Sequence, residues 1–214
     1  AQNRPNFLFI ITDDQDPGTL NVYGDKECST PNLDALATEG MTIIGAHQMG
    51  SFTGAVSTAS RSMLMTGLNL WNAQKIRENM NKYEKLCGNS DIAPKDSPEY
   101  NSLPALFHRA GYETFRTCKM GNSYDPANAM FDERHDKTCR MAEDEKGSKW
   151  HADHVIDYFN RRTQKSDSEK KPFFVYLGFS HPHDARHGKP ELLAKYGAED
   201  VKEPNKLNDK MPSL

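Results

Sequence analysis

The chain has 214 residues, and 27 lysines and arginines against 30 aspartates and glutamates give a formal net charge of −3. This near-balance argues against a general nucleic-acid-binding protein, which carries a clear basic excess. The longest apolar runs, residues 7–11 and 173–179, are far shorter than the roughly 20 residues that a membrane-spanning helix needs. The length suits one domain or a large part of one. Four scattered cysteines without a CxxC pair exclude a disulfide scaffold and leave one or two disulfides open.

Short apolar runs alternate with helix-like segments along the chain, which is typical of a layered α/β fold. Residues 6–12 are almost continuously apolar and predict a strand that is buried on both faces. Thr30, as a capping residue, and Pro31, in the first turn, predict a helix that ends at Gly40. Residues 41–46 predict another strand.

The second half of the chain continues the alternation. Two stretches rich in Asn, Asp, Lys and Pro, residues 72–102 and 121–147, predict long surface insertions of the kind that shape a substrate cleft. The tail, residues 186–214, is polar and charged, without a terminating element. Three further helices are expected, over residues 58–66, 102–110 and 148–164. Gly67 ends the first, and the second is capped by Ser102 and ended by Gly111. Two further strands are expected over residues 112–119 and 172–180.

Polar residues follow three of the predicted strands, at the end where open α/β sheets bind ligands. Asp13 and Asp14 follow the first strand, Lys119 ends the strand over 112–119, and His181 and His183 follow the last. Adjacent acids suit a hard cation such as calcium or magnesium, although a solvated turn gives the same pattern. The lysine alone is equally typical of a surface charge. The histidines fit a metal pair, an acid–base site or a structural role.

Residues 54–67 lead from small side chains into a helix. Ser57 lies in its first turn, and Arg61 follows four positions later on the same face. A helix N-terminus beside an arginine is a site for an oxyanion. The spacing alone fits a capped helix with a surface charge equally well.

The same segment resembles the signature of type I sulfatases, the formylglycine-dependent branch of the alkaline phosphatase superfamily. The signature is a Cys or Ser, then x, Pro or Ala, x and Arg, with a downstream Thr-Gly. It is matched here by Ser57, Ala59 and Arg61 with residues 65–67. Residues 4–14, 30–40 and 172–183 are similar to further segments of the family in the same order.

The resemblance implies an alkaline-phosphatase-like fold, with a mixed, mostly parallel sheet sandwiched between helices. Residues 1–214 correspond to the N-terminal portion of the catalytic domain. The family's second pair of calcium ligands, its second sulfate-binding lysine and its small C-terminal sheet domain have no counterpart here. We therefore expect this C-terminal remainder on a separate or missing segment.

The resemblance also implies the roles of the matching residues. Ser57 corresponds to the residue that is oxidised to formylglycine, whose hydrated aldehyde is the nucleophile. Asp13 and Asp14, with the oxygen at position 57, would ligate Ca²⁺. Arg61 would position the aldehyde hydrate and neutralise charge. Val56 beside the signature residue usually accompanies cysteine in this family, which favours a cysteine replaced by serine over a native serine-type enzyme.

The resemblance also implies substrate-binding roles for three further residues. Lys119 would clamp a sulfate oxygen, and His183 would bind the substrate and protonate the leaving alcohol. The family often has a histidine two residues after that lysine, where this chain has Gly121. His181, a further substrate-binding candidate, and His135 are the candidates to replace it.

The resulting prediction is a sulfatase that acts on a sulfated carbohydrate, either an algal polysaccharide such as carrageenan or an oligosaccharide. An arylsulfatase or choline sulfatase fits the same signature. The expected partners are a formylglycine-generating or radical-type maturase and the C-terminal remainder, and family habit places such enzymes in the periplasm or outside the cell. The alternatives are a phosphatase or phosphodiesterase of the same superfamily, with Ser57 as direct nucleophile, and a catalytically inactive binder of sulfated glycans.

Overall fold

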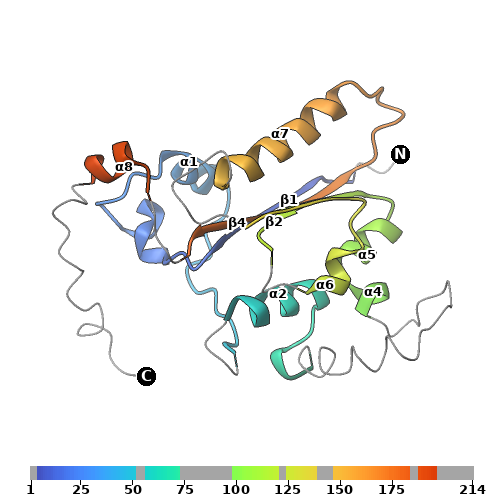
Figure 1. Cartoon of the computed structure of the whole chain (residues 1–214), viewed down its shortest axis with the longest axis horizontal. Helices are drawn as coiled ribbons and strands as arrows, with labels where there is room; N and C mark the ends of the chain where they lie inside the picture. The colour runs from blue at the N-terminus through green and yellow to red at the C-terminus, as the bar shows by residue number, and fades with distance from the viewer. Residues whose placement is uncertain are drawn as a thin grey trace.

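Parallel strands form one sheet in the order β1-β4-β2-β3 in the computed structural model. The structure describes residues 4–51, 56–72, 98–120, 124–138, 147–183 and 188–196. The two long apolar strands, β1 and β4, lie side by side although they come from opposite ends of the chain (Figure 1). All four strands run in one direction, so their carboxyl ends share one edge of the sheet. Their bounds are β1 Phe7–Asp13, β2 Glu113–Cys118, β3 Glu133–Asp136 and β4 Phe173–Pro182.

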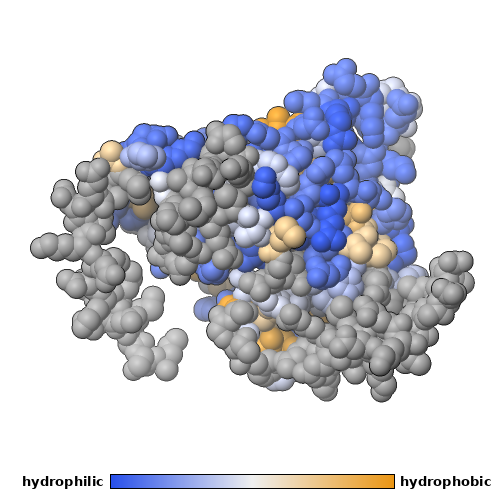
Figure 2. All heavy atoms as spheres, in the orientation of Figure 1, coloured by the Kyte–Doolittle hydropathy of each residue, from blue (hydrophilic) through white to orange (hydrophobic). Residues whose placement is uncertain are grey.

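Helices cover both faces of the sheet (Figure 1). The long helix α7, Ser148–Thr163, packs on β4 and β2 from one face, and α2, Val56–Thr66, lies on the other. Figure 2 shows a largely hydrophilic outer surface over α7. No helix in the described part of the chain is long and apolar enough to span a membrane. The remaining elements are η1 Pro17–Thr19, η2 Asn21–Tyr23, α1 Pro31–Glu39, α4 Pro98–Asn101, α5 Leu103–Arg109, α6 Asp125–Asn128 and α8 Pro190–Lys195.

The core has two halves, one on each face of the sheet. Side chains alternate between the faces along a strand, so β4 must be apolar on both sides when helices cover both. Phe174 and Tyr176 of β4 belong to the half under α2, whereas Val175 and Leu177 belong to the half under α7. All four are at most 5% exposed. This arrangement confirms the predicted layered α/β fold with a strongly apolar strand over residues 172–180.

Strand β1 differs from its prediction. The apolar run predicts burial on both faces, but Phe7, Leu8 and Ile10 are 42%, 46% and 51% exposed. The reason is position rather than composition: β1 is at the edge of the four described strands, and α7 packs mainly on β4 and β2. An apolar edge strand of this kind is a surface that normally has a partner.

Several local predictions are wrong. Residues 41–46 form no strand, and Met41 is 88% exposed, because a short apolar run without a pairing partner does not define a strand. Thr30 precedes α1, but its side chain does not cap that helix; it donates instead to Asp34. Ser102 precedes α5, also without a side-chain cap. Among the expected insertions, residues 98–101 form α4, residues 125–128 form α6 and residues 133–136 form β3.

Other predictions fall on residues outside the described ranges. These include most of the first insertion, the two ends of the second, Gly121, Cys87, Cys139 and the end of the tail. Within the described part, Cys28 and Cys118 are free cysteines. The described piece of the tail contains the helix α8, which the sequence analysis did not predict.

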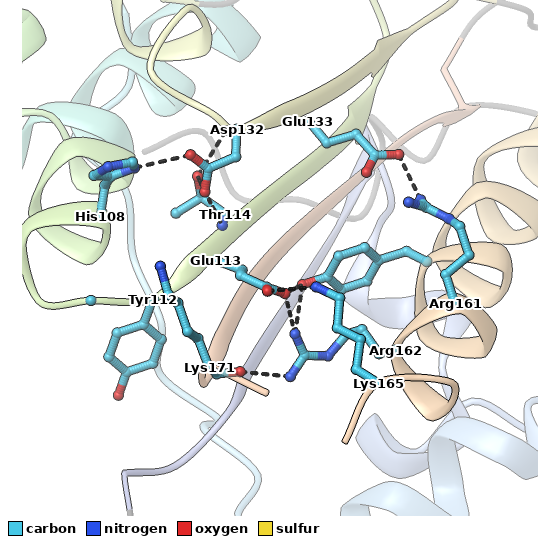
Figure 3. A pocket seen from close by; sticks show the side chains of 12 residues that line it. His108, Tyr112, Glu113, Thr114, Asp132, Glu133, Arg161, Arg162, Lys165 and Lys171 are labelled. Atoms are coloured by element: carbon cyan, nitrogen blue, oxygen red, sulfur yellow. Dashed lines mark hydrogen bonds and ion pairs between the residues drawn. The ribbon is translucent and has the colours of Figure 1, made fainter. Parts of the chain in front are cut away.

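A cluster of ion pairs joins α7 to the start of β2, at the end of the sheet opposite to the predicted site residues (Figure 3). Glu113 accepts hydrogen bonds from Tyr158 at 3.2 Å and Lys165 at 2.8 Å, and it pairs with Arg162. Although burial opposes its charge, these bonds and cations hold the pKa of Glu113 below its ordinary value. The cavity beside this cluster measures about 350 Å³. Because its acids already have basic partners, we assign it to holding α7 on the sheet.

Candidate active site

Asp13 is the centre of the predicted site. Its carboxylate, at the end of β1, is 2% exposed. Oδ1 accepts a hydrogen bond of 3.0 Å from Ser57 Oγ and lies 3.7 Å from Nη2 of Arg61. Oδ2 forms an ion pair with Nζ of Lys119. Side chains from two distant parts of the chain, α2 and the end of β2, thus converge on one buried acid.

The sheet explains this convergence. Strands β1 and β2 flank β4, and the parallel direction of all three brings Asp13 and Lys119 to the same edge. The backbone N–H of Lys119 donates to the carbonyl of Gly178 at 3.0 Å, which extends the ladder one residue beyond β2. Asp14 then adopts a left-handed backbone conformation with φ of 60°, uncommon for a residue with a side chain. This conformation turns the chain away from the strand at Asp14.

Helix α2 supplies Ser57 and Arg61 from its first two turns. Residues four apart on a helix share a face, so both side chains point toward the end of β1. Arg61 is 2% exposed, whereas Ser57 is only partly buried. Burial opposes the charge of Arg61, but attraction by Tyr176, Cys118 and Asp13 outweighs it and raises the pKa of Arg61 above its ordinary value. The side chain is therefore a permanent cation at the site.

The three candidate histidines have different partners in the structure. Nε2 of His183 lies 3.4 Å from Oδ2 of Asp14, and both side chains remain partly open to solvent. His181 instead shares a hydrogen bond of 2.9 Å with Ser148 at the start of α7. His135 lies on β3 and bonds to Glu133, away from the Asp13 group. Of the three, only His183 lies beside one of the adjacent acids.

A cavity of about 350 Å³ lies beside the carboxylate of Asp13. Lys119, His181 and His183 do not line it. It exposes Ser57, Arg61 and both acids to one space of the size of a small-molecule site. Gln15, Gln48 and Ser60 also contribute to its wall. They could not be predicted, because isolated polar residues in loops and helices form no recognisable sequence pattern. The full lining is Ile11, Thr12, Asp13, Asp14, Gln15, Gln48, Val56, Ser57, Ser60 and Arg61.

The chemistry of the donors fits a hard cation in part. Asp13 and Asp14 present carboxylate oxygens, and the hydroxyl of Ser57 adds a third oxygen next to them. Calcium takes about six to eight oxygen ligands, so these residues would supply only part of its shell. Within the described ranges, no cluster of three or more His, Cys, Asp or Glu residues could hold a metal. A bound calcium would need further ligands from elsewhere.

The family model for sulfatases matches residues 5–210 of this chain. A sulfatase from Formosa agariphila is 27% identical over 247 aligned positions, covering 99% of this chain and 46% of that protein. The chain therefore spans less than half the length of this relative.

Solved structures share the fold. The complex of BT4656 with its substrate D-glucosamine-2-N,6-O-disulfate has a TM-score of 0.64 at 22% identity, covering 95% of this chain and 40% of that one. The complex of Ps i-CgsB with k-i-k-neocarrahexaose has a TM-score of 0.66 at 20% identity, covering 94% and 50%. A protein of the alkaline phosphatase superfamily from Vibrio parahaemolyticus has a TM-score of 0.58 at 16% identity, covering 87% and 43%.

At these identities the structures establish the fold alone, which is alkaline-phosphatase-like as predicted. The family match extends over nearly the whole chain and includes every residue that meets at Asp13. The chain belongs to the sulfatase family.

Proposed function

We propose that the protein to which this chain belongs hydrolyses sulfate esters at the Asp13 site. The observation that carries the proposal is the convergence of Ser57, Arg61 and Lys119 on one buried carboxylate. An oxygen nucleophile beside two fixed cations is the arrangement that transfer of an anionic sulfuryl group requires.

Each residue has a separate task in this proposal. Residue 57 carries the attacking oxygen, and Asp13 accepts its proton through the 3.0 Å hydrogen bond. Arg61 and Lys119 attract the sulfate oxygens and offset the charge that moves during bond cleavage. Because both cations are at most 2% exposed, water screens them little and their attraction for an anion is strong.

The leaving alcohol needs a proton, and His183 is the residue we propose for it. It is 25% exposed, so the remainder of a substrate can reach it, and Asp14 lies 3.4 Å from its Nε2. A histidine that a substrate can reach in this way can pass a proton to the leaving oxygen as a general acid. This geometry favours His183 over His181, which bonds to Ser148 at the start of α7.

A modified residue 57 and a bound cation complete the proposal. We propose that position 57 works as formylglycine, made by a maturase from cysteine or serine, which supplies a hydrated aldehyde as the nucleophile. We also propose that Asp13, Asp14 and the oxygen at position 57 hold Ca²⁺, which when bound would withdraw charge from the sulfate oxygens.

The proposed substrate is a sulfated saccharide. Support comes from the neighbouring folds, one bound to a disulfated glucosamine that is its substrate and one bound to a neocarrahexaose. Sulfated algal galactans such as carrageenan and sulfated oligosaccharides belong to this class. A location in the periplasm or outside the cell, where such polymers are met, is part of the same proposal.

The C-terminal remainder of a longer protein is the partner we propose for β1. The exposed apolar side chains of Phe7, Leu8 and Ile10 on an edge strand need a cover, and the relatives are more than twice as long as the matched region. A further strand beside β1 would bury them and bring additional calcium ligands to the same edge of the sheet.

The test is the release of inorganic sulfate from sulfated mono- and oligosaccharides by the full-length protein. Ser57→Cys, expressed with a maturase, should release sulfate, and Arg61→Ala made in that background should not. Release of phosphate from phosphate esters, without sulfate release, would instead favour the phosphatase. Saccharide binding without any turnover would favour an inactive binder.

A further inference from the structure

The guanidinium group of Arg61 is held in one orientation by its contacts. A guanidinium group has several N–H donors in a rigid plane, and its effect on a substrate depends on which of them faces the cavity. Nη2 lies 3.7 Å from Oδ1 of Asp13, on the side of the site. Nη1 instead donates hydrogen bonds to buried side chains of the sheet. The side chain is 2% exposed, so protein contacts rather than water determine this orientation.

Two neighbouring strands provide the partners of Nη1. Tyr176 of β4 accepts a hydrogen bond through its hydroxyl at 3.1 Å, and Cys118 of β2 accepts one through Sγ at 3.0 Å. Both must act as acceptors, because a guanidinium group can only donate. Tyr176 and Cys118 are each 0% exposed.

Gly178 leaves the space that this contact needs. It pairs with Cys118 across β2 and β4. A Cβ atom at position 178 would lie 2.3 Å from Sγ of Cys118 and 3.0 Å from Nη1 of Arg61. Both distances are shorter than ordinary van der Waals contact. The glycine thus allows the thiol and the guanidinium group to lie directly against the strand.

Tyr176 is itself held on both sides. Its ring stacks on Phe9 at a centroid distance of 5.5 Å, and the guanidinium group of Arg116 lies 5.2 Å from the ring centroid. Burial raises the pKa of Tyr176 to about 12, so the hydroxyl keeps its proton at neutral pH. A fixed, neutral phenol offers Arg61 one acceptor in one place.

We propose that Tyr176, Cys118 and Gly178 are positioning residues that fix Nη1 of Arg61, so that Nη2 is directed at Asp13 and the cavity. We call these three residues the arginine seat. None of them lines the cavity, so they act on a substrate only through Arg61. The effect on turnover rests on the proposed sulfatase function, whereas the effect on the orientation of the arginine does not.

The first test compares Tyr176→Phe with Tyr158→Phe in the full-length protein with residue 57 matured. Tyr158 is a matched control because it is also a buried tyrosine, but it bonds to Glu113 on the other face of the sheet. We expect Tyr176→Phe to lower kcat about tenfold, the usual consequence of losing one hydrogen bond to a charged group, with little change in KM. Tyr158→Phe should leave kcat within about twofold of the parent value.

A second readout needs no activity. In protein labelled with ¹⁵N-arginine, the Nη signals of Arg61 should be separate in the parent, because the seat stops rotation of the guanidinium group, and should merge in Tyr176→Phe. Unchanged Nη signals in that variant would overturn the seat. Merged signals with unchanged kcat would overturn its role in turnover. A parent that releases no sulfate would refute the proposed function, and the Nη signals would still decide the seat.

Gly178→Ala separates packing from positioning. The single variant should be less thermally stable, because its Cβ meets Sγ of Cys118. Adding Cys118→Ala removes that sulfur and leaves a Cβ–Cβ contact of 3.3 Å, but the 3.0 Å approach to Nη1 of Arg61 persists. The melting temperature of the double variant should therefore return close to the parent value, while its kcat should remain at least about tenfold below that of the parent. Full kcat in the stable double variant would contradict the proposal.

Discussion

The hydroxyl of Ser57 donates a 3.0 Å hydrogen bond to Oδ1 of Asp13 and thereby joins the start of α2 to the end of β1. The same carboxylate pairs with Lys119, from the end of β2. One buried acid therefore fixes the proposed nucleophile and a cation relative to each other. The charge balance of this group determines both its stability and its chemistry.

Asp13→Asn should destabilise the fold strongly. The substitution leaves Lys119, which is 0% exposed, and Arg61 as buried cations without their counterion. Loss of one partner of a buried ion pair costs about 3–5 kcal/mol. Urea unfolding monitored by circular dichroism measures the difference. Adding Lys119→Met should restore part of it, and a loss below about 1 kcal/mol in the single variant would show that the pairing is weak.

Glu113→Gln should affect stability without affecting turnover. Glu113 is 22% exposed and bonds to Arg162 and Lys165, so part of its pairing is screened by water. We expect a loss of about 1 kcal/mol in the free energy of unfolding and an unchanged kcat. A large fall in kcat would mean that the cluster in Figure 3 communicates with the Asp13 site.

His151 should make stability depend on pH. Nε2 lies 3.0 Å from the carbonyl of Lys137 and must donate to it, and Nδ1 shares a hydrogen bond of 2.7 Å with the hydroxyl of Thr117. Burial lowers the pKa of His151 from 6.5 to about 4, so the folded ring is neutral at pH 7. Between these two values the unfolded chain binds the proton and the folded chain does not, so stability is lost as the pH falls from about 6.5 toward 4.

The measurement is urea unfolding of the parent and of His151→Gln at pH 7 and pH 4.5. The parent should lose about 2 kcal/mol more than the variant over this range, because glutamine cannot take up the proton. Equal losses in the two proteins would show that other groups cause the acid sensitivity.

Removal of calcium should abolish turnover reversibly. Treatment of the matured full-length protein with EGTA should stop sulfate release, and added Ca²⁺ should restore it, because oxygen ligands of this kind favour a hard cation. Activity that persists in EGTA after the metal content has been shown to be zero would refute the calcium proposal. Restoration by Zn²⁺ alone would favour the chemistry of the phosphatase branch.

Much of the site was predictable because its residues follow strong patterns. Asp13 ends the apolar strand β1 and Lys119 directly follows β2, and parallel strands place such residues at one edge of the sheet. Ser57 and Arg61 share a helix face by spacing alone. The sequence could not show that all of them meet at Asp13, because that contact depends on the strand order, in which β4 lies between β1 and β2.

The failures have physical causes too. The strand β3, with the sequence Glu-Arg-His-Asp, has no apolar alternation; it is held by pairing with β2, and an ion pair of 3.0 Å joins Asp136 to Arg116. Residues 41–46 have the apolar pattern but no partner strand. Tyr176 looks like an ordinary core residue in an apolar run, and only its contact with Arg61 distinguishes it.

The decisive measurement of the proposed function is sulfate release by Ser57→Cys prepared with a maturase. Mass spectrometry of the peptide that ends at Arg61 first shows that residue 57 carries the aldehyde. Ser57→Ala prepared in the same way is the control. We expect the first protein to free inorganic sulfate from a sulfated saccharide and the second to free none. A protein that carries the aldehyde, holds calcium and still frees no sulfate from any sulfated saccharide would contradict it.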